Sequence, residues 1–343
     1  MGVFDFVKIF RVNKSISIDL GTANILIYDK QRKKIVLNEP SVVARDRKTG
    51  RLIAVGKEAR EMLGKTPDSI QAIKPLQDGV IADIDSTKEM ITYFIHKIYG
   101  NSLFKPEVMI CVPIEVTSVE RKALFDAVKG AKKTYIIEEG RAAIIGSGVD
   151  ISQPEGSMVI DIGGGSTDIA ILSLDEIIAS KSIRIAGNRF DEDIVRYVKR
   201  KYNLLIGDRT AEKIKKELGS ALKVQSPEVM EIKGRDLETG IPNTVEVNAN
   251  EIYEAIEDSL FQIVNSTKEV LEKCPPELAA DILDHGIVMT GGGSLIRNFI
   301  DMMEKEVGIK VFLSPNPLDS VVLGGGAAFD NKKLLRTLQM KEN

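Results

Sequence analysis

The chain has 343 residues, of which 43% are hydrophobic and 28% charged, and its formal net charge is -3. This length is enough for two or three domains with ample cores. The near-neutral charge gives no reason to expect nucleic acid as a partner. With only two histidines, the composition argues against histidine-based metal sites and catalytic triads. The two cysteines are expected to be reduced residues of a cytosolic protein.

The N-terminal segment, residues 1–13, combines apolar and charged residues without the shape of a cleavable signal peptide. On a helical wheel Phe6 and Phe10 share a broad apolar face, while Asp5 and Lys8 lie opposite. We therefore predict a short amphipathic segment that lies at a membrane surface, or alternatively packs on the body of the protein. No apolar run approaches the roughly 18 residues of a membrane span.

Residues 158–172 form an apolar strand, a glycine-rich turn and a second apolar strand. The glycines permit positive φ and let backbone N–H groups approach a ligand closely, and the hydroxyls add donors, so the turn suits a phosphate. Asp161, at the end of the first strand, suits a cation beside that phosphate. The alternative is a hairpin turn without a ligand. The turn consists of Gly163, Gly164, Gly165, Ser166 and Thr167.

The same pattern occurs earlier in the chain, where Asp19 ends an apolar strand and another strand follows the turn. That turn contains Gly21, Thr22, Ala23 and Asn24. Two such hairpins indicate a duplicated architecture that holds one nucleotide between its halves. A third glycine cluster follows an apolar strand and is a candidate to meet the sugar and base; it consists of Gly291, Gly292 and Gly293.

Strands and helices alternate in both halves, which indicates α/β domains with largely buried sheets. In the first half we expect strands at 108–112 and 135–137 and helices at 57–63, 86–99 and 118–131. In the second half we expect helices at 191–202, 211–218 and 249–274, a strand at 311–312, a turn at 324–328 and a basic C-terminal helix.

These elements suggest four parts. Residues 1–13 are the N-terminal segment, and residues 14–150 are a first domain with a small insertion at about 38–80. Residues 151–321 are a second domain with an insertion at about 188–248, and residues 322–343 return to the first domain. The stretch 153–156, Gln-Pro-Glu-Gly, marks the border between the halves.

Five strings of residues resemble the actin, sugar-kinase and heat-shock-chaperone ATPase superfamily and, within it, the MreB family of bacterial actin homologues. The resemblance covers residues 14–330 and implies an α/β, actin-like fold: two related domains with a nucleotide cleft between them, each with a smaller inserted subdomain. The strings are residues 19–24, 38–42, 78–83, 183–187 and 290–295.

The resemblance implies that ATP and Mg²⁺ are bound. The turns at 21–24 and 163–167 would grip the phosphates, Asp19 and Asp161 would hold hydrated Mg²⁺, and Gly291, Gly292 and Gly293 would face the nucleoside. Glu139 would orient the attacking water, with Thr167 as the second candidate, whereas Glu138 is expected to be structural. The adenine would lie against the helix at 210–216, nearest Glu212, Lys215 and Lys216; on the residues alone, a solvated helix with Glu/Lys pairs is the alternative.

The chain departs from the family pattern near the expected catalytic residue. The usual Glu-Glu-Pro-Met is replaced by Glu138-Glu139-Gly140-Arg141, and Asp168 stands where glutamate is typical. Loss of the proline adds backbone freedom beside Glu139. We therefore expect ATP binding to be kept and hydrolysis to be slow, in a divergent paralogue.

The implied function is a cytoskeletal ATPase that polymerises with ATP into actin-like filaments at the inner face of the cytoplasmic membrane. It would determine bacterial cell shape, or shape and motility in a wall-less cell. The expected partners are further copies of the chain, the inner membrane surface with its anionic lipids, paralogues and membrane morphogenesis proteins. Leu103 and Phe104, in a loop that dips into lipid in family members, would contact the membrane together with Phe6 and Phe10.

Two other classes share the hairpins. A small-molecule kinase would need an acceptor pocket, for which the sequence offers no recognisable motif. A chaperone ATPase would need a peptide-binding domain after residue 330, for which the remaining sequence is too short.

Overall fold

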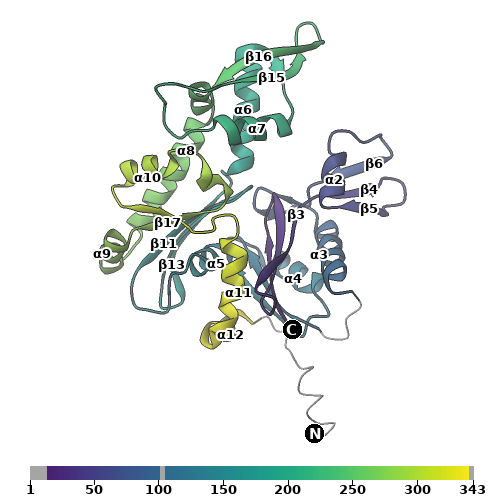
Figure 1. Ribbon diagram of the computed structural model, residues 1–343. Coiled ribbons are helices and arrows are strands. Elements are labelled where there is room, and N and C mark those ends of the chain that lie inside the picture. The colour runs from purple at the N-terminus through teal and green to yellow at the C-terminus, as the bar shows by residue number, and fades with distance from the viewer. Residues whose placement is uncertain (1–13, 101–104, 340–343) are drawn as a thin grey trace. The chain divides into compact units, whose positions relative to one another are not determined.

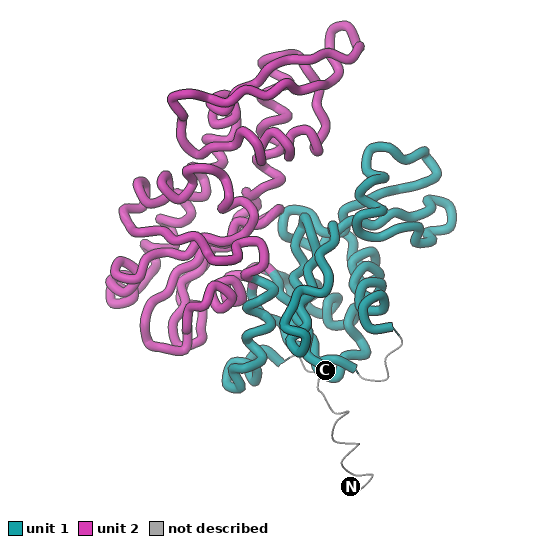
Figure 2. Tube along the Cα trace, viewed as in Figure 1, with its two compact units in different colours: residues 1–112, 116–138, 321–343 teal, residues 113–115, 139–320 magenta. Residues whose placement is uncertain are grey.

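The computed structural model describes residues 14–100 and 105–339, which form two compact units. Unit 1 is drawn from residues 1–112, 116–138 and 321–343, and unit 2 from residues 113–115 and 139–320 (Figure 2). Apart from residues 113–115, unit 2 begins at Glu139, whereas the sequence suggested a border near residue 150. The reason is that the helix starting at Glu139 packs on the sheet of unit 2.

Unit 1 contains a five-stranded sheet, a smaller three-stranded sheet and helices on either side (Figure 1). Its elements are β1 (Ser15–Leu20), β2 (Asn24–Asp29), β3 (Lys34–Pro40), β4 (Val43–Asp46), β5 (Leu52–Val55), α2 (Lys57–Met62), β6 (Ile70–Ile73), β7 (Leu76–Gln77), β8 (Val80–Ile81), α3 (Ile84–Tyr99), β9 (Glu107–Val112), α4 (Ser118–Ala127), β10 (Lys133–Glu138), α11 (Ser320–Ala327), η2 (Ala328–Asp330) and α12 (Lys332–Leu338).

The main sheet of unit 1 has the order β10-β9-β1-β2-β3. β1, β2 and β3 form an antiparallel meander, while β9 and β10 run parallel to β1. Helices cover the sheet, so β9 is a nearly continuous apolar run, as expected of a strand buried on both faces. β1 is also buried on both faces, although its isoleucines alternate with the buried Ser15 and Ser17. Phe94 of α3 is fully buried against this sheet. The sheet β5-β4-β6 and α2 enclose a separate small core around Ala44 and Ala59.

Unit 2 contains a second five-stranded sheet and a small sheet of its own. Its elements are α5 (Glu139–Gly146), β11 (Ser157–Ile162), β12 (Thr167–Ser173), β13 (Glu176–Ile183), α6 (Gly187–Tyr202), β14 (Leu204–Leu205), α7 (Asp208–Leu218), β15 (Val229–Asp236), β16 (Pro242–Asn248), α8 (Ala249–Glu272), α9 (Pro276–His285), β17 (Ile287–Thr290), η1 (Gly292–Leu295), α10 (Phe299–Val307) and β18 (Val311–Leu313).

The main sheet of unit 2 repeats the plan of unit 1. Its order is β13-β12-β11-β17-β18, with β11, β12 and β13 antiparallel and β17 and β18 parallel to β11. Each unit therefore starts its sheet with the hairpin that carries a glycine turn. The duplication that the paired hairpins predicted is present.

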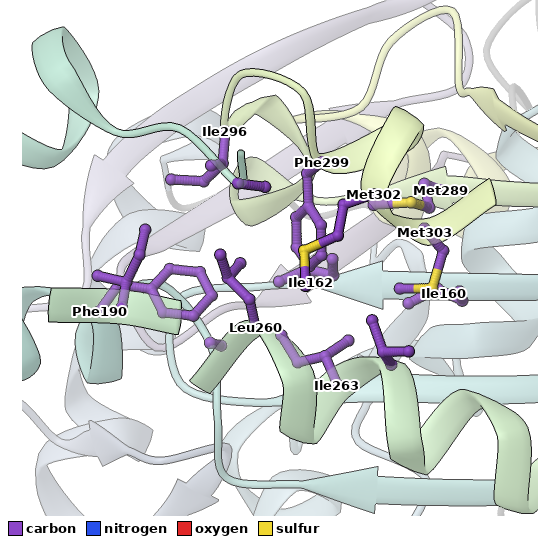
Figure 3. Close-up of a cluster of buried hydrophobic side chains, with 14 of the residues drawn as sticks. Ile160, Ile162, Phe190, Leu260, Ile263, Met289, Ile296, Phe299, Met302 and Met303 are labelled. Atoms are coloured by element: carbon purple, nitrogen blue, oxygen red, sulfur yellow. The ribbon is translucent and has the colours of Figure 1, made fainter. Parts of the chain in front are cut away.

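The core of unit 2 lies between this sheet and the long helix α8. Figure 3 shows side chains of β11, α8 and α10 packed around one another. The labelled residues are Ile160, Ile162, Phe190, Leu260, Ile263, Met289, Ile296, Phe299, Met302 and Met303. α8 is fixed at its start by a capping box between Asn248 and Glu251. Within residues 14–100 and 105–339, no helix is both long and apolar enough to cross a membrane.

The glycine run near the C-terminus differs from its predicted turn. Gly325 and Gly326 lie inside the helix α11, which packs on the sheet of unit 1. A Cβ on Gly325 would lie 2.2 Å from Ser17 Oγ, and one on Gly326 would lie 2.5 Å from the ring of Tyr28. The prediction was wrong because these glycines provide close packing of a helix on strands and do not provide a bend.

Candidate functional site

The turn between β1 and β2 in unit 1 is anchored from outside the hairpin. Ser41 Oγ donates to the carbonyl of Gly21 at 2.6 Å, and Ser41 N donates to the carbonyl of Ala23 at 3.0 Å. A Cβ on Gly21 would lie 2.7 Å from Asn24 O, so the turn closes only with glycine at this position. The conformation of the loop is thus fixed by its own sequence and by Ser41.

Thr22 connects this loop to a second tight turn. Its side chain is buried, and its Oγ1 accepts a hydrogen bond from Gly79 N at 3.2 Å. Asp78 and Gly79 both have positive φ, the conformation required by the two-residue turn that joins β7 and β8. The Thr22 hydroxyl keeps its proton to donate, which suits a phosphoryl oxygen.

The glycine turn of unit 2 is docked on the start of α6. Gly163 N donates to Ser166 O at 2.9 Å and closes the turn. The carbonyls of Gly163 and Gly164 accept from Gly187 N and Asn188 N at 3.2 and 2.7 Å. The loop is therefore held largely through its carbonyl groups.

The two expected catalytic residues both belong to unit 2. Glu139 is the first residue of α5 and is 8% exposed. Thr167 is fully buried, and its hydroxyl donates to Ile185 O at 2.6 Å. Since that proton is committed, Thr167 can act on a water only as an acceptor. Glu138, which ends β10 in unit 1, lies 3.9 Å from Arg121 in an ion pair.

The residues that depart from the family pattern are all buried. Arg141 forms an ion pair with Glu176 of β13 at 3.6 Å. Asp168 accepts a hydrogen bond from Ile114 N at 3.3 Å, and desolvation raises its pKa to about 6. A Cβ on Gly140 would lie 3.3 Å from Ile114 and 3.2 Å from Ala170, so this position is tightly packed.

Asp161, near the end of β11, lies against the third glycine cluster. Gly291 has φ of +81°, and a Cβ there would lie 2.6 Å from Asp161 Oδ1 and 2.3 Å from Ile162 O. A Cβ on Gly293 would lie 2.3 Å from Ile162 Cγ2. At Gly291 and Gly293 the close approach is therefore to β11, whereas Gly292 would meet only a side-chain atom of Leu318.

The three α7 residues expected near the adenine differ in their surroundings. Lys216 pairs with Glu212 across one turn at 2.6 Å, and its side chain is 66% exposed. Lys215 is turned toward α6, where its Nζ donates to Gly187 O at 2.7 Å and lies 2.9 Å from Asp191 Oδ1. The ammonium of Lys215 is thus engaged by protein groups.

The residues proposed to hold a cation are Asp19 and Asp161, one in each unit. Asp161 is 5% exposed and Asp19 is half-buried on β1. Across the part of the chain that the structure describes, no group of three or more His, Cys, Asp or Glu side chains is placed to hold a metal. Carboxylates that act singly fit Mg²⁺, which is bound mostly by substrate phosphates and water.

The sequence did not identify several residues that position the site. Ser41, Gly79 and Gly187 lie within strings that pointed to the family, but their roles depend on contacts across the fold. Asp191 carried no sequence signal beyond its place on a helix. The four residues assigned to the membrane, Phe6, Phe10, Leu103 and Phe104, lie outside the described residues.

Comparison with known proteins gives consistent matches over nearly the whole chain. The model of the MreB/Mbl protein family matches residues 13–337. The chain is 49% identical to the cell shape-determining protein Mbl of Bacillus subtilis over 321 residues, which cover 93% of this chain and 96% of that protein. It is 47% identical to the cell shape-determining protein MreB of Escherichia coli over 326 residues, which cover 93% and 94% of the two chains.

Solved structures agree with this assignment. The crystal structures of MreB5 of Spiroplasma citri bound to ADP and to AMPPNP each match with a TM-score of 0.88 and 38% identity, covering 95% of this chain and 98% of that one. The MamK double helical filament matches with a TM-score of 0.79 at 22% identity, over 93% and 99% of the chains, and supports the fold alone. The expected actin-like fold is confirmed, and the chain belongs to the MreB/Mbl protein family.

Proposed function

We propose that this protein binds and hydrolyses ATP and polymerises into actin-like filaments that determine cell shape. The observation that carries the proposal is the repeated sheet, in which each unit places an Asp-led glycine and hydroxyl turn at the same point of the same topology. Relatives with this fold have been solved with ADP and with AMPPNP bound. Relatives at nearly half identity are named cell shape-determining proteins.

The two turns supply donors for phosphoryl oxygens. In unit 2 the carbonyls of Gly163 and Gly164 are bonded to α6, so we assign the N–H groups of residues 164–166 to the phosphates. In unit 1 the Thr22 hydroxyl and the loop N–H groups have the same task. Asp19 and Asp161 would hold Mg²⁺, which neutralises the charge that develops on the phosphates.

Hydrolysis requires a group that orients water. Glu139 is the first residue of α5 and largely shielded from solvent, which suits a carboxylate that accepts a hydrogen bond from the attacking water. Thr167 would accept a second one. Gly140 is tightly packed despite the missing proline; we therefore expect hydrolysis to be slow but present.

The proposal also includes filament formation and the binding of the filament to the membrane. The filament is a homopolymer, and it lies on the inner face of the cytoplasmic membrane through the segment 1–13 and the Leu103-Phe104 pair. Paralogues and membrane morphogenesis proteins would join it there. These partners rest on the family resemblance and on the apolar residues of the two segments.

Electron microscopy of negatively stained protein tests the proposal. We expect filaments with ATP and Mg²⁺ and far fewer when the nucleotide is omitted, together with phosphate release. If the purified chain binds ATP but forms no filaments and transfers phosphate to small acceptors instead, the small-molecule kinase is the correct class.

A further inference from the structure

The first turn of α6 connects two parts of the candidate site within unit 2. Its N–H groups at Gly187 and Asn188 donate to the carbonyls of Gly163 and Gly164 in the glycine turn. The carbonyl of Gly187 in turn accepts from Lys215 Nζ of α7 at 2.7 Å. A continuous set of hydrogen bonds therefore runs from the phosphate-type turn to the helix expected beside the nucleoside.

Asp191 holds the lysine in this arrangement. It lies one helical turn after Gly187, and its Oδ1 is 2.9 Å from Lys215 Nζ, with side-chain exposures of 16% for Asp191 and 13% for Lys215. A lysine ammonium is a point charge with rotatable donors on a flexible stem, so one backbone carbonyl does not fix its position. The carboxylate of Asp191 supplies the second contact that does.

The spacing at this junction is tight. A Cβ on Gly187 would lie 3.3 Å from Lys215 Nζ and 3.4 Å from Gly163 O. The turn, the start of α6 and the lysine of α7 thus meet at one glycine. Because Lys215 belongs to α7, a displacement of Lys215 from Gly187 would also move α7.

We propose that Asp191 is a positioning residue of the nucleotide site, which keeps Lys215 on Gly187 and so fixes the spacing between the glycine turn and α7. The inference rests on the proposed function, in which the turn takes phosphates and α7 takes the nucleoside. A ligand that spans both parts needs this spacing. A ligand that is only a phosphate chain does not.

The test compares two ligands on the full chain. ATP and inorganic tripolyphosphate are titrated in Mg²⁺ buffer at neutral pH against wild type, Asp191→Asn and Asp191→Glu. The matched control is Asp301→Asn, an exposed carboxylate in the first turn of α10 in the same unit. We expect Asp191→Asn to weaken ATP binding by about five- to tenfold. Tripolyphosphate affinity should stay unchanged, Asp191→Glu should recover part of the loss, and Asp301→Asn should match wild type.

A pH series gives a second readout, in which wild type and Asp191→Asn are compared at each pH. Desolvation raises the pKa of Asp191 to about 6, with Lys215 opposing the rise and Glu212 and Asp208 of α7 adding to it. Acidification through that value protonates the carboxylate and releases Lys215. The ratio of ATP affinities, wild type over Asp191→Asn, should therefore decline toward one below about pH 6.

The outcomes separate the inference from the proposed function. If the wild type binds no ATP, both the proposed function and this inference are overturned. ATP binding that Asp191→Asn leaves intact overturns the inference alone. If Asp191→Asn weakens the binding of ATP and of tripolyphosphate equally, the inference is also overturned. A general loss of fold would reduce both affinities, whereas a change of spacing would reduce only the affinity for ATP.

Discussion

At the scale of single residues, the contact between Gly291 and β11 explains why a glycine is needed beside the proposed cation ligand. The backbone of Gly291 has a positive φ and packs on Ile162 and on the carboxylate of Asp161. Any side chain at position 291 would therefore both strain the backbone and displace Asp161.

Replacing Gly291 by alanine should lower the free energy of unfolding by about 3 kcal/mol or more, since strain and steric overlap add. Gly292→Ala is the matched control, because it has no positive φ and its Cβ would meet only Leu318 Cδ2, at 3.3 Å. Urea denaturation measures both. Equal midpoints for the two variants would show that the contact with β11 does not determine the glycine.

Glu139 and Glu138 form a natural pair for testing catalysis, because they are adjacent in sequence but belong to different units. Glu139→Gln should reduce phosphate release by about 10²-fold and leave ATP affinity nearly unchanged. Glu138→Gln should weaken the ion pair with Arg121 and keep most of the turnover. Comparable turnover by wild type and Glu139→Gln would exclude Glu139 as the water-orienting residue.

The raised pKa of Asp191 also predicts how stability depends on pH. Its native value of about 6 exceeds the ordinary 3.8, so between these values the native state binds a proton that the unfolded state does not. This group's contribution to stability is therefore lost as pH rises, by roughly 1 kcal/mol from pH 5 to pH 7. Asp191→Asn should remove that slope from urea-melting curves. A variant with the wild-type slope would show that another group titrates.

At the scale of elements, the strands of both main sheets and most of the helices could be predicted from apolar periodicity. The glycine runs show where such reasoning stops. The turns at 21–24 and 163–167 lie between two strands of matching pattern, so their conformation was predictable from local sequence. Residues 324–326 have a similar composition, but their glycines are required by Ser17 and Tyr28, which are hundreds of residues away in sequence. No local pattern distinguishes these two uses of glycine.

The packing of α11 can be tested with a pair of substitutions. Gly325→Ala should destabilise the protein by about 1–3 kcal/mol through overlap with Ser17 Oγ and Cys111 Sγ. Adding Ser17→Ala removes the closest atom and should recover part of the loss. Gly207→Ala, a site with open space and no positive φ, is the control. Thermal melting of wild type, Gly325→Ala, Ser17→Ala, the double variant and the control measures the coupling. Strictly additive effects of the two substitutions would contradict the contact.

At the scale of the whole molecule, the membrane proposal depends on repetition. Burial of Leu103 and Phe104 contributes roughly 2 kcal/mol each at most, too little to hold one subunit on a bilayer. A filament repeats the contact at every subunit, so binding should appear only with polymerisation.

Liposome pelleting tests this dependence. We expect the wild type to sediment with anionic vesicles under polymerising conditions. Leu103→Ser/Phe104→Ser should sediment less, and further deletion of residues 1–12 should reduce sedimentation again. Vesicles of neutral lipid are the control. If the deleted double variant still forms filaments and pellets as well as wild type, these two segments are not the anchor.

The position of α11 has a consequence for how the protein is made. Cys111 Sγ donates to the carbonyl of Val321, 210 residues later in the chain, and the β10 residue Tyr135 packs on Phe329. The first sheet is thus completed by segments that leave the ribosome roughly 10–40 s after its own strands, at ~5–20 residues per second. Unit 2 is nearly continuous in sequence and can fold during that interval. The N-terminal half of the nascent chain therefore exposes an apolar face during that interval, which makes it a substrate for chaperones.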